Sequence, residues 1–245
     1  MRVFITGSAD GLGKLAAGSL LDSGHDVVVH VRSADRRPAV TALIDRGAEL
    51  VVGDLADLDQ ARDVAAQVNV LGPMDAVIHN AGVNSGRELA AVNVVAPFVL
   101  TATMLRPQRL VYLSSGMHRG GRPFTDGNPF VGRGSQVTYS DSKLFVTTLA
   151  LAVARLWPEV HSNAVDPGWV PTRMGGSRAP DDLRLGHLTQ EWLATSTDPD
   201  ALTTGGYWHH QRRREPHPST RDKSFQTRLL DALAEVTGVK IEGLG

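Results

Sequence analysis

Strand-like and helix-like segments alternate along about the first two-thirds of the chain, and this alternation limits the fold more than any other feature. Short runs rich in Val, Ile and Leu predict buried strands, and the segments between them carry apolar side chains at helical spacing. Such alternation builds βαβ units, which give a parallel sheet with helices on both faces. We therefore expect a doubly wound parallel sheet in a three-layer α/β/α arrangement. The expected strands cover residues 3–5, 27–31, 49–52, 76–79, 110–114 and 160–165, and the longest expected helix covers 139–156.

Composition excludes several classes of function. The 245 residues predict one domain over 1–245, and 25 Lys+Arg against 26 Asp+Glu leave a net charge of −1. A nucleic-acid or anionic-membrane partner requires a basic excess, so we expect neither. Because the chain has 0 Cys, disulfides, thiolate metal sites and a cysteine nucleophile are excluded. No apolar run approaches the roughly 18 residues of a membrane span, and we expect a cytoplasmic protein.

The pattern weakens after Pro171. Residues 173–200 contain several Gly and Pro and few periodic apolar positions, which predicts a lid over the substrate. A short closing strand is expected at 205–208, and the arginines at 212–214 are interpreted as a solvated run within a polar linker. A terminal amphipathic helix is predicted by Phe225, Leu229, Leu230, Leu233 and Val236.

A glycine-rich loop separates the first strand from the first helix, with the sequence Thr6-Gly7-Ser8-Ala9-Asp10-Gly11-Leu12-Gly13. Glycines there permit a tight turn and a close approach of the backbone to a ligand. The free N–H groups and the positive dipole end of the helix suit a pyrophosphate. Three glycines alone are a weak signal, but the strand–loop–helix context favours dinucleotide binding.

The spacing Gly7-x-x-x-Gly11-x-Gly13 resembles the TGxxxGxG motif of the short-chain dehydrogenase/reductase family. Further family motifs follow in order: Gly53-Asp54-Leu55, Asn80-Ala81-Gly82, Asn93, Ser114-Ser115, Tyr139-Ser140-Asp141-Ser142-Lys143 and Asp166-Pro167-Gly168-Trp169-Val170-Pro171-Thr172. The resemblance covers the whole chain, and its C-terminal region is similar to the retinol-dehydrogenase-like branch. It implies a Rossmann fold that binds NAD(P). The residues expected to bind the cofactor are Thr6, Gly7, Ser8, Asp10, Gly11, Leu12, Gly13, Arg32, Asp54, Leu55, Asn80, Ala81, Gly82, Tyr139, Lys143, Pro167, Gly168, Val170 and Thr172.

Tyr139 and Lys143 are four residues apart, which places both side chains on one face of a helix. A nearby ammonium favours the phenolate, so we expect Lys143 to lower the pKa of Tyr139. Tyr139 can then exchange a proton with a substrate oxygen, to which Ser115 donates a hydrogen bond. The family resemblance implies that Lys143 also holds the nicotinamide ribose and that Asn93 organises a water in a proton relay. The expected reaction interconverts an alcohol and a ketone or aldehyde, with these small molecules as substrate.

Several of these residues have simpler explanations. Asn93 is alternatively a buried polar residue that bonds the backbone, and Asp54 is alternatively the N-cap of the following helix. Trp169 and Trp192 line the substrate pocket or belong to the core. A metal site is not expected, because no carboxylate pattern accompanies His209, His210 and His217.

The residues at the end of the second strand indicate whether the cofactor carries a 2′-phosphate. A ribose 2′-OH is met by an acid at this place, whereas a 2′-phosphate is met by an arginine. The strand ends His30-Val31-Arg32-Ser33, with no acid before Asp35, which favours NADP(H). Asp10 argues the other way, because NADP-preferring relatives often carry a basic residue there, and NAD(H) stays the alternative.

Two segment lengths depart from the family pattern. Asn80 and Asn93 are only 13 positions apart, and the missing part normally contributes to oligomer contacts, so a homodimer and a homotetramer both stay open. Ser115 and Tyr139 are 24 positions apart, and we expect the insertion to run over the substrate cleft. It is similar to that of the retinol-dehydrogenase-like branch but does not identify the substrate.

Two other functions are possible for a chain with these motifs. One is a dinucleotide-binding sensor or scaffold without turnover, which has no physical need for Ser115, Tyr139 and Lys143 together. The other is a nucleotide-sugar epimerase, which is disfavoured by the glycine spacing and by the length of the chain.

Overall fold

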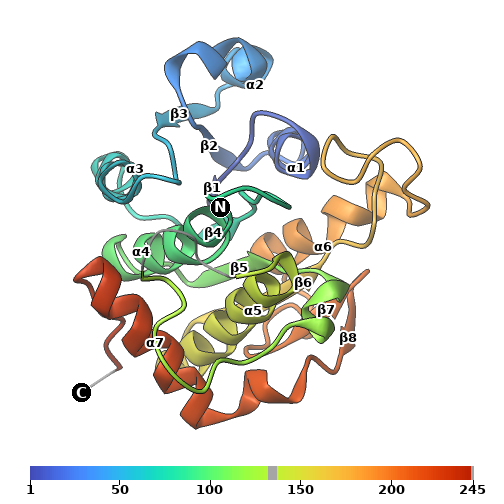
Figure 1. Cartoon of the computed structure of the whole chain (residues 1–245). Helices are drawn as coiled ribbons and strands as arrows, with labels where there is room; N and C mark the ends of the chain where they lie inside the picture. The colour runs from blue at the N-terminus through green and yellow to red at the C-terminus, as the bar shows by residue number, and fades with distance from the viewer. Residues whose placement is uncertain (132–136, 244–245) are drawn as a thin grey trace.

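In the computed structural model, which describes residues 1–131 and 137–243, the chain forms a sheet of eight strands in the order β3-β2-β1-β4-β5-β6-β7-β8 (Figure 1). Every neighbouring pair from β3 to β7 is parallel, and β8 runs antiparallel to β7. The strands are β1 (Arg2–Ile5), β2 (Asp26–Val31), β3 (Glu49–Val52), β4 (Ala76–His79), β5 (Arg109–Leu113), β6 (His161–Asp166), β7 (Tyr207–His209) and β8 (Arg212–Arg214).

Helices cover both faces of the sheet, which confirms the doubly wound α/β/α Rossmann fold (Figure 1). One apolar cluster joins the sheet to α3 (Leu58–Leu71), α4 (Ala96–Thr103), α5 (Tyr139–Leu156) and α7 (Lys223–Thr237). The other joins the opposite face to α1 (Gly11–Asp22), α2 (Thr41–Ile44) and α6 (Leu183–Thr195). Strands buried on both faces explain why the expected strands were short and almost wholly apolar.

Two of the expected helices have a local irregularity. The helix predicted after β2 is a 3₁₀ segment, η1 (Ala34–Val40), followed by only four α-helical residues. Pro38 lies inside η1, where its missing N–H prevents a regular α-helix. The helix predicted around Asn93 begins as a π-helical segment, η2 (Ala91–Val95), before α4.

Two expectations about the C-terminal third are wrong. Residues 173–200 are not irregular throughout, because α6 lies within them and packs against α1 and β5. Only residues 173–182 stay as the candidate lid. The arginines at 212–214 are not a linker: they form β8, whose side chains are solvent-exposed as expected. Charged side chains on an edge strand oppose pairing with another chain.

The described part of the insertion after Ser115 packs on α5, and its expected course over the substrate cleft stays a prediction. Its first part is the 3₁₀ segment η3 (Gly116–Gly120), and its described remainder runs to residue 131. Phe124 and Phe130 contact Phe145 of α5, and Phe124 also contacts Phe225 of α7. Together with α7 and the 3₁₀ segment η4 (Pro218–Arg221), it encloses α5, so that residues 141–154 are all buried. Residues 132–136 of this insertion lie outside the described part.

Candidate active site

The strand order reverses between β1 and β4, and the loops that follow these two strands are tied together there. The Thr6 hydroxyl accepts from the N–H of Ala81 at 2.9 Å, and the Asn80 amide donates to the Thr6 carbonyl at 2.9 Å. Gly7 has φ +69°, and a Cβ on it would lie 2.9 Å from Cα of Ala81. Gly7 is therefore required both by its backbone conformation and by the approach of Ala81. Open α/β sheets bind their ligands at such a crossover point.

A cavity of about 630 Å³ lies at this point. Of the residues predicted to bind the cofactor, those that line it are Gly7, Asp10, Gly11, Leu12, Arg32, Asp54, Leu55, Asn80, Ala81, Gly82, Tyr139, Lys143, Pro167 and Thr172. The motif prediction missed His30, Arg36, Arg87, Glu88, Ser114, Arg173 and Met174, among others. A glycine cradle at one end and basic side chains beside it fit a dinucleotide.

The other predicted cofactor residues shape the loops around this cavity but do not line it. Ser8 is fully buried, and its hydroxyl donates to the Ile5 carbonyl at 2.6 Å. Gly13 approaches Asn80 so closely that a Cβ would lie 2.3 Å from its amide nitrogen. Gly168 has φ +81°, and Val170 is buried against Gly186 of α6. Thr6, described above, completes this group.

The first turn of α5 carries the predicted proton-transfer pair. Thr138 caps the helix through a capping box with Asp141, which starts the helix at Tyr139. The Lys143 ammonium nitrogen lies 5.6 Å from the centroid of the Tyr139 ring and donates to the Leu113 carbonyl at 2.8 Å. Both side chains line the same cavity as the glycine loop, as their spacing predicts.

The electrostatics of this pair differ from the expectation. Burial raises the pKa of Tyr139, a hydrogen bond with Ser115 acts in the opposite direction, and the Asp166 carboxylate raises it further. Burial lowers the pKa of Lys143 to about 8, partly offset by Asp166. The pKa of Tyr139 is therefore raised by burial, and not lowered by Lys143 as expected.

The buried-polar alternative for Asn93 fits its contacts. Its side-chain oxygen accepts from the N–H of Val83 at 2.8 Å, and its amide donates to the Val83 carbonyl at 2.9 Å and to Ser142 at 3.0 Å. Asn93 nevertheless lies beside the pair, because a Cβ on Gly82 would lie 3.4 Å from its oxygen and 3.5 Å from the Lys143 nitrogen.

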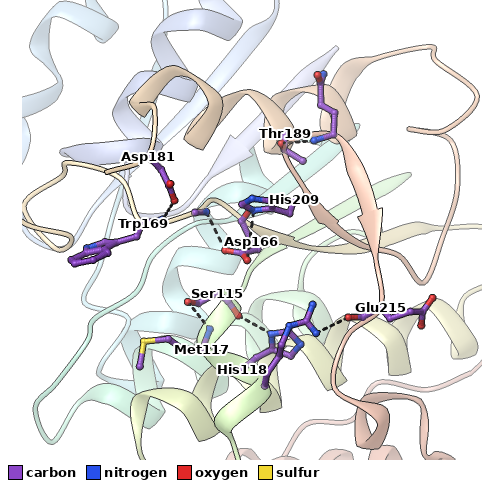
Figure 2. Close-up of polar contacts among 12 residues, drawn as sticks. Ser115, Met117, His118, Asp166, Trp169, Asp181, Thr189, His209 and Glu215 are labelled. Carbon is purple, nitrogen blue, oxygen red and sulfur yellow. Dashed lines mark hydrogen bonds and ion pairs between the residues drawn. The ribbon is translucent and has the colours of Figure 1, made fainter. Parts of the chain in front are cut away.

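Asp166 belongs to one of the family motifs but was not predicted as a site residue, and the structure makes it a further functional candidate. It ends β6 with its carboxylate facing Ser115 (Figure 2), accepts from the N–H of Gly168 at 3.0 Å and lies 3.6 Å from His209. Its charge acts on Tyr139 and on Lys143. An acid directly before Pro-Gly at a strand end was the available signal.

The two tryptophans have different environments. Trp169 is 59% exposed at the rim of this region, where its backbone N–H donates to the Asp181 carboxylate at 2.6 Å (Figure 2). Trp192 meets Trp208 edge-on, with ring centroids 5.1 Å apart, on the α1 side of the sheet. The core interpretation therefore holds for Trp192 and not for Trp169.

The capping alternative for Asp54 is wrong, because the N-cap of α3 is Asp57, whose carboxylate accepts from Asp59 and Gln60. Asp54 instead lines the cavity and accepts from the N–H of Ala56 at 2.9 Å. Within residues 1–131 and 137–243, no group of three or more His, Cys, Asp or Glu side chains is placed to hold a metal ion.

A second hollow, of about 790 Å³, lies along the outer side of α1 and is lined by Lys14, Arg46 and His187 among others. It contains none of the residues on α5, and we attach no role to it.

Residues 1–183 match the short chain dehydrogenase family, and the chain belongs to this family of oxidoreductases. An uncharacterised oxidoreductase of Emericella nidulans is 34% identical over 262 residues, covering 99% of each chain. Mouse (Mus musculus) retinol dehydrogenase 14 is 28% identical over 97% of this chain and 86% of its own, in line with the predicted branch. A blue fluorescent protein from a metagenomic library, crystallised with NADPH, has the same fold, with a TM-score of 0.71 at 24% identity over 85% of this chain and 95% of that one.

Among the described residues, none of the helices has the length and apolar character needed to cross a bilayer.

Proposed function

We propose that the protein is an NADP(H)-dependent oxidoreductase that interconverts an alcohol and a ketone or aldehyde. The observation that carries this proposal is the position of Tyr139 and Lys143 in the same cavity as the glycine loop and Arg32. One cavity thus combines a cradle for a dinucleotide with a group that exchanges a proton. A dinucleotide sensor has no physical need for the second part.

In this proposal, the bound nicotinamide supplies the hydride, and the protein supplies position and a proton. Burial raises the pKa of Tyr139, so its hydroxyl is protonated at neutral pH and is ready to donate to a carbonyl oxygen. Ser115 hydrogen-bonds the same oxygen. Lys143 holds the nicotinamide ribose, and Asn93, bonded to Val83, takes part in the proton relay.

The preference for NADP(H) rests on two arginines. Arg32, as predicted, and Arg36 both line the cavity. Arg36 lies 3.5 Å from Asp10, which offsets the negative charge that argued against a phosphate. The fold relative crystallised with NADPH is consistent with this preference. NAD(H) is the alternative.

Arg32→Ala is expected to weaken NADPH binding by roughly 10- to 100-fold, the value of a charge-assisted hydrogen bond, and to leave NADH binding almost unchanged. Fluorescence titration with both dinucleotides measures this. Arg37→Ala is the matched control, because Arg37 is exposed and does not line the cavity. An equal loss for NADPH and NADH would contradict the assignment.

The reaction is tested with a panel of ketones and aldehydes, reduced at the expense of NADPH or NADH. Turnover of at least one carbonyl compound would support the proposal that the protein is an enzyme. Tight NADPH binding with no turnover across a broad panel would favour the sensor instead.

The candidate lid at 173–182 is expected to be cut first in limited proteolysis and to be protected by NADPH. Arg173 and Met174 line the cavity, and the hydrogen bond between Trp169 and Asp181 joins the two ends of the loop. Trypsin can cleave after Arg173 and Arg178, and Arg221, which does not line the cavity, is the reference site. Equal rates of cleavage with and without NADPH would contradict the lid hypothesis.

A further inference from the structure

His30, in β2, has a buried ring that links the two sides of the cavity. The side chain is 2% exposed. Its Nδ1 accepts from the N–H of Gly7 in the glycine loop at 3.0 Å, and its Nε2 donates to the carbonyl of Gly53, after β3, at 2.8 Å. A carbonyl only accepts and a backbone N–H only donates. The two partners therefore require the neutral tautomer with its proton on Nε2.

The backbone of the same residue holds the next position of the loop. The N–H of Ser8 donates to the His30 carbonyl at 3.0 Å, and the N–H of His30 donates to the Ser8 hydroxyl at 3.2 Å. The bond from Gly7 to the ring is the part of this connection that depends on the side chain. Gly7, with its φ of +69°, is the residue that turns the chain here.

We propose that His30 is a positioning residue for the dinucleotide: its neutral ring holds Gly7 in place, and protonation of Nδ1 releases the loop and weakens binding. The inference rests on the proposed function, because it takes the cavity to be a dinucleotide site. A protonated imidazole donates from both nitrogens, so Nδ1–H would oppose the N–H of Gly7 across a buried contact. An unpaired buried donor is costly, and the loop moves away instead.

The surroundings favour the neutral ring at neutral pH. Burial lowers the pKa of His30, while the bond to Gly53 and the charge of Asp54 raise it. The charged side chains that share the cavity with the ring are Asp10, Arg32, Arg36, Asp54, Arg87, Glu88, Lys143 and Arg173. Because the net direction is downward, the neutral form predominates at and above the ordinary value of 6.5, and the loop contact is lost only as the pH falls through the lowered pKa of His30.

Three substitutions separate the two ring nitrogens. His30→Asn keeps an acceptor at the δ position for Gly7 and does not titrate. His30→Gln keeps a donor at the ε position for Gly53 and has no acceptor at the δ position for Gly7. His30→Phe keeps the ring and loses both. His161→Gln is the control, since His161 is a partly buried histidine at the opposite end of its strand, in β6.

The experiment is a fluorescence titration of each protein with NADH and NADPH from pH 8 to pH 5 at constant ionic strength. NADH is decisive, because a 2′-phosphate itself titrates near pH 6. For the wild type and His161→Gln, the Kd for NADH should rise roughly tenfold per pH unit once His30 protonates. His30→Asn should bind with little pH dependence, whereas His30→Gln and His30→Phe should bind roughly tenfold or more weakly already at pH 8.

A second readout needs no dinucleotide. NMR of the ¹⁵N-labelled imidazole in the ligand-free protein should show the proton on Nε2, and the Gly7 amide signal should shift with the titration of His30. Proton on Nδ1, or His30→Gln and His30→Phe proteins that are folded by circular dichroism and bind NADH within twofold of wild type, would overturn the inference. A wild type that shows the tautomer but binds neither dinucleotide at pH 8 would instead refute the proposed function, and the positioning role with it.

Discussion

Tyr139→Phe is expected to lower the rate of carbonyl reduction by roughly 10²–10⁴-fold, the usual contribution of a positioned general acid, while the Kd for NADPH stays within about twofold. The substitution removes one oxygen and keeps the ring that packs near Lys143. The proposed proton donor is lost, but the glycine loop and the arginines proposed to hold the dinucleotide are unchanged. Steady-state kinetics beside a cofactor titration measure the two effects separately.

Tyr112→Phe is the matched control for this experiment. Its hydroxyl is buried in the core and bonds Thr101 at 2.8 Å, and it does not line the cavity. It should lose about 1 kcal/mol of stability and retain turnover. If Tyr139→Phe reduces a carbonyl as fast as the wild type, the proposed proton donor is wrong.

Lys143→Met is expected to abolish turnover, weaken NADPH binding and make the protein more stable at pH 7. Burial lowers the pKa of Lys143 from 10.5 to about 8. Holding the ammonium in place at neutral pH therefore costs about 3 kcal/mol. Methionine removes that cost and loses the hydrogen bond to the Leu113 carbonyl, worth about 1 kcal/mol. The net gain of about 2 kcal/mol corresponds to a rise in Tm of about 4–8 °C.

The stability difference between Lys143→Met and the wild type should change with pH in one direction, which a general packing effect would not cause. The unfolded chain binds the Lys143 proton more tightly than the folded protein does, so the penalty is complete below pH 8 and disappears as the pH rises toward 10.5. The stability difference between the two proteins should shrink over this interval, measured by urea unfolding at each pH. A constant difference, or a variant less stable at pH 7, would contradict the desolvation argument.

Much of the sheet could be predicted because its strands are buried on both faces. β3, β4 and α5 have the bounds that apolar runs and helical spacing indicated, since their sequences match a core environment. α6 was missed because part of its buried face consists of Gly186, Thr189 and Gln190, which give no apolar period. β8 was missed because it consists of three arginines, which give no apolar pattern, and it forms only by pairing with β7. The turn between them uses His210 and Gln211 at positive φ, without the usual glycine.

The candidate site was predictable only where a motif marks it. Tyr139, Lys143 and the glycine loop meet as their order along the chain implied. His30 and Arg36 have their places in the site because of tertiary contacts that no local spacing encodes. His30 has the sequence environment of an ordinary strand residue, and its ring gains its two partners only where the fold brings Gly7 and Gly53 to it. The direction of the Tyr139 pKa likewise depends on burial, which composition does not reveal.

The enclosure of α5 by α7, η4 and the insertion also affects how the protein can assemble. With residues 141–154 of this helix buried within a single chain, no apolar stripe of α5 is left for a second copy to cover. A homodimer or homotetramer would have to form through other surfaces, or displace α7 first. Lys143 and its neighbours on α5 are enclosed by the same polypeptide and not by a second subunit. Their environment should therefore not depend on protein concentration, because no association equilibrium has to form it.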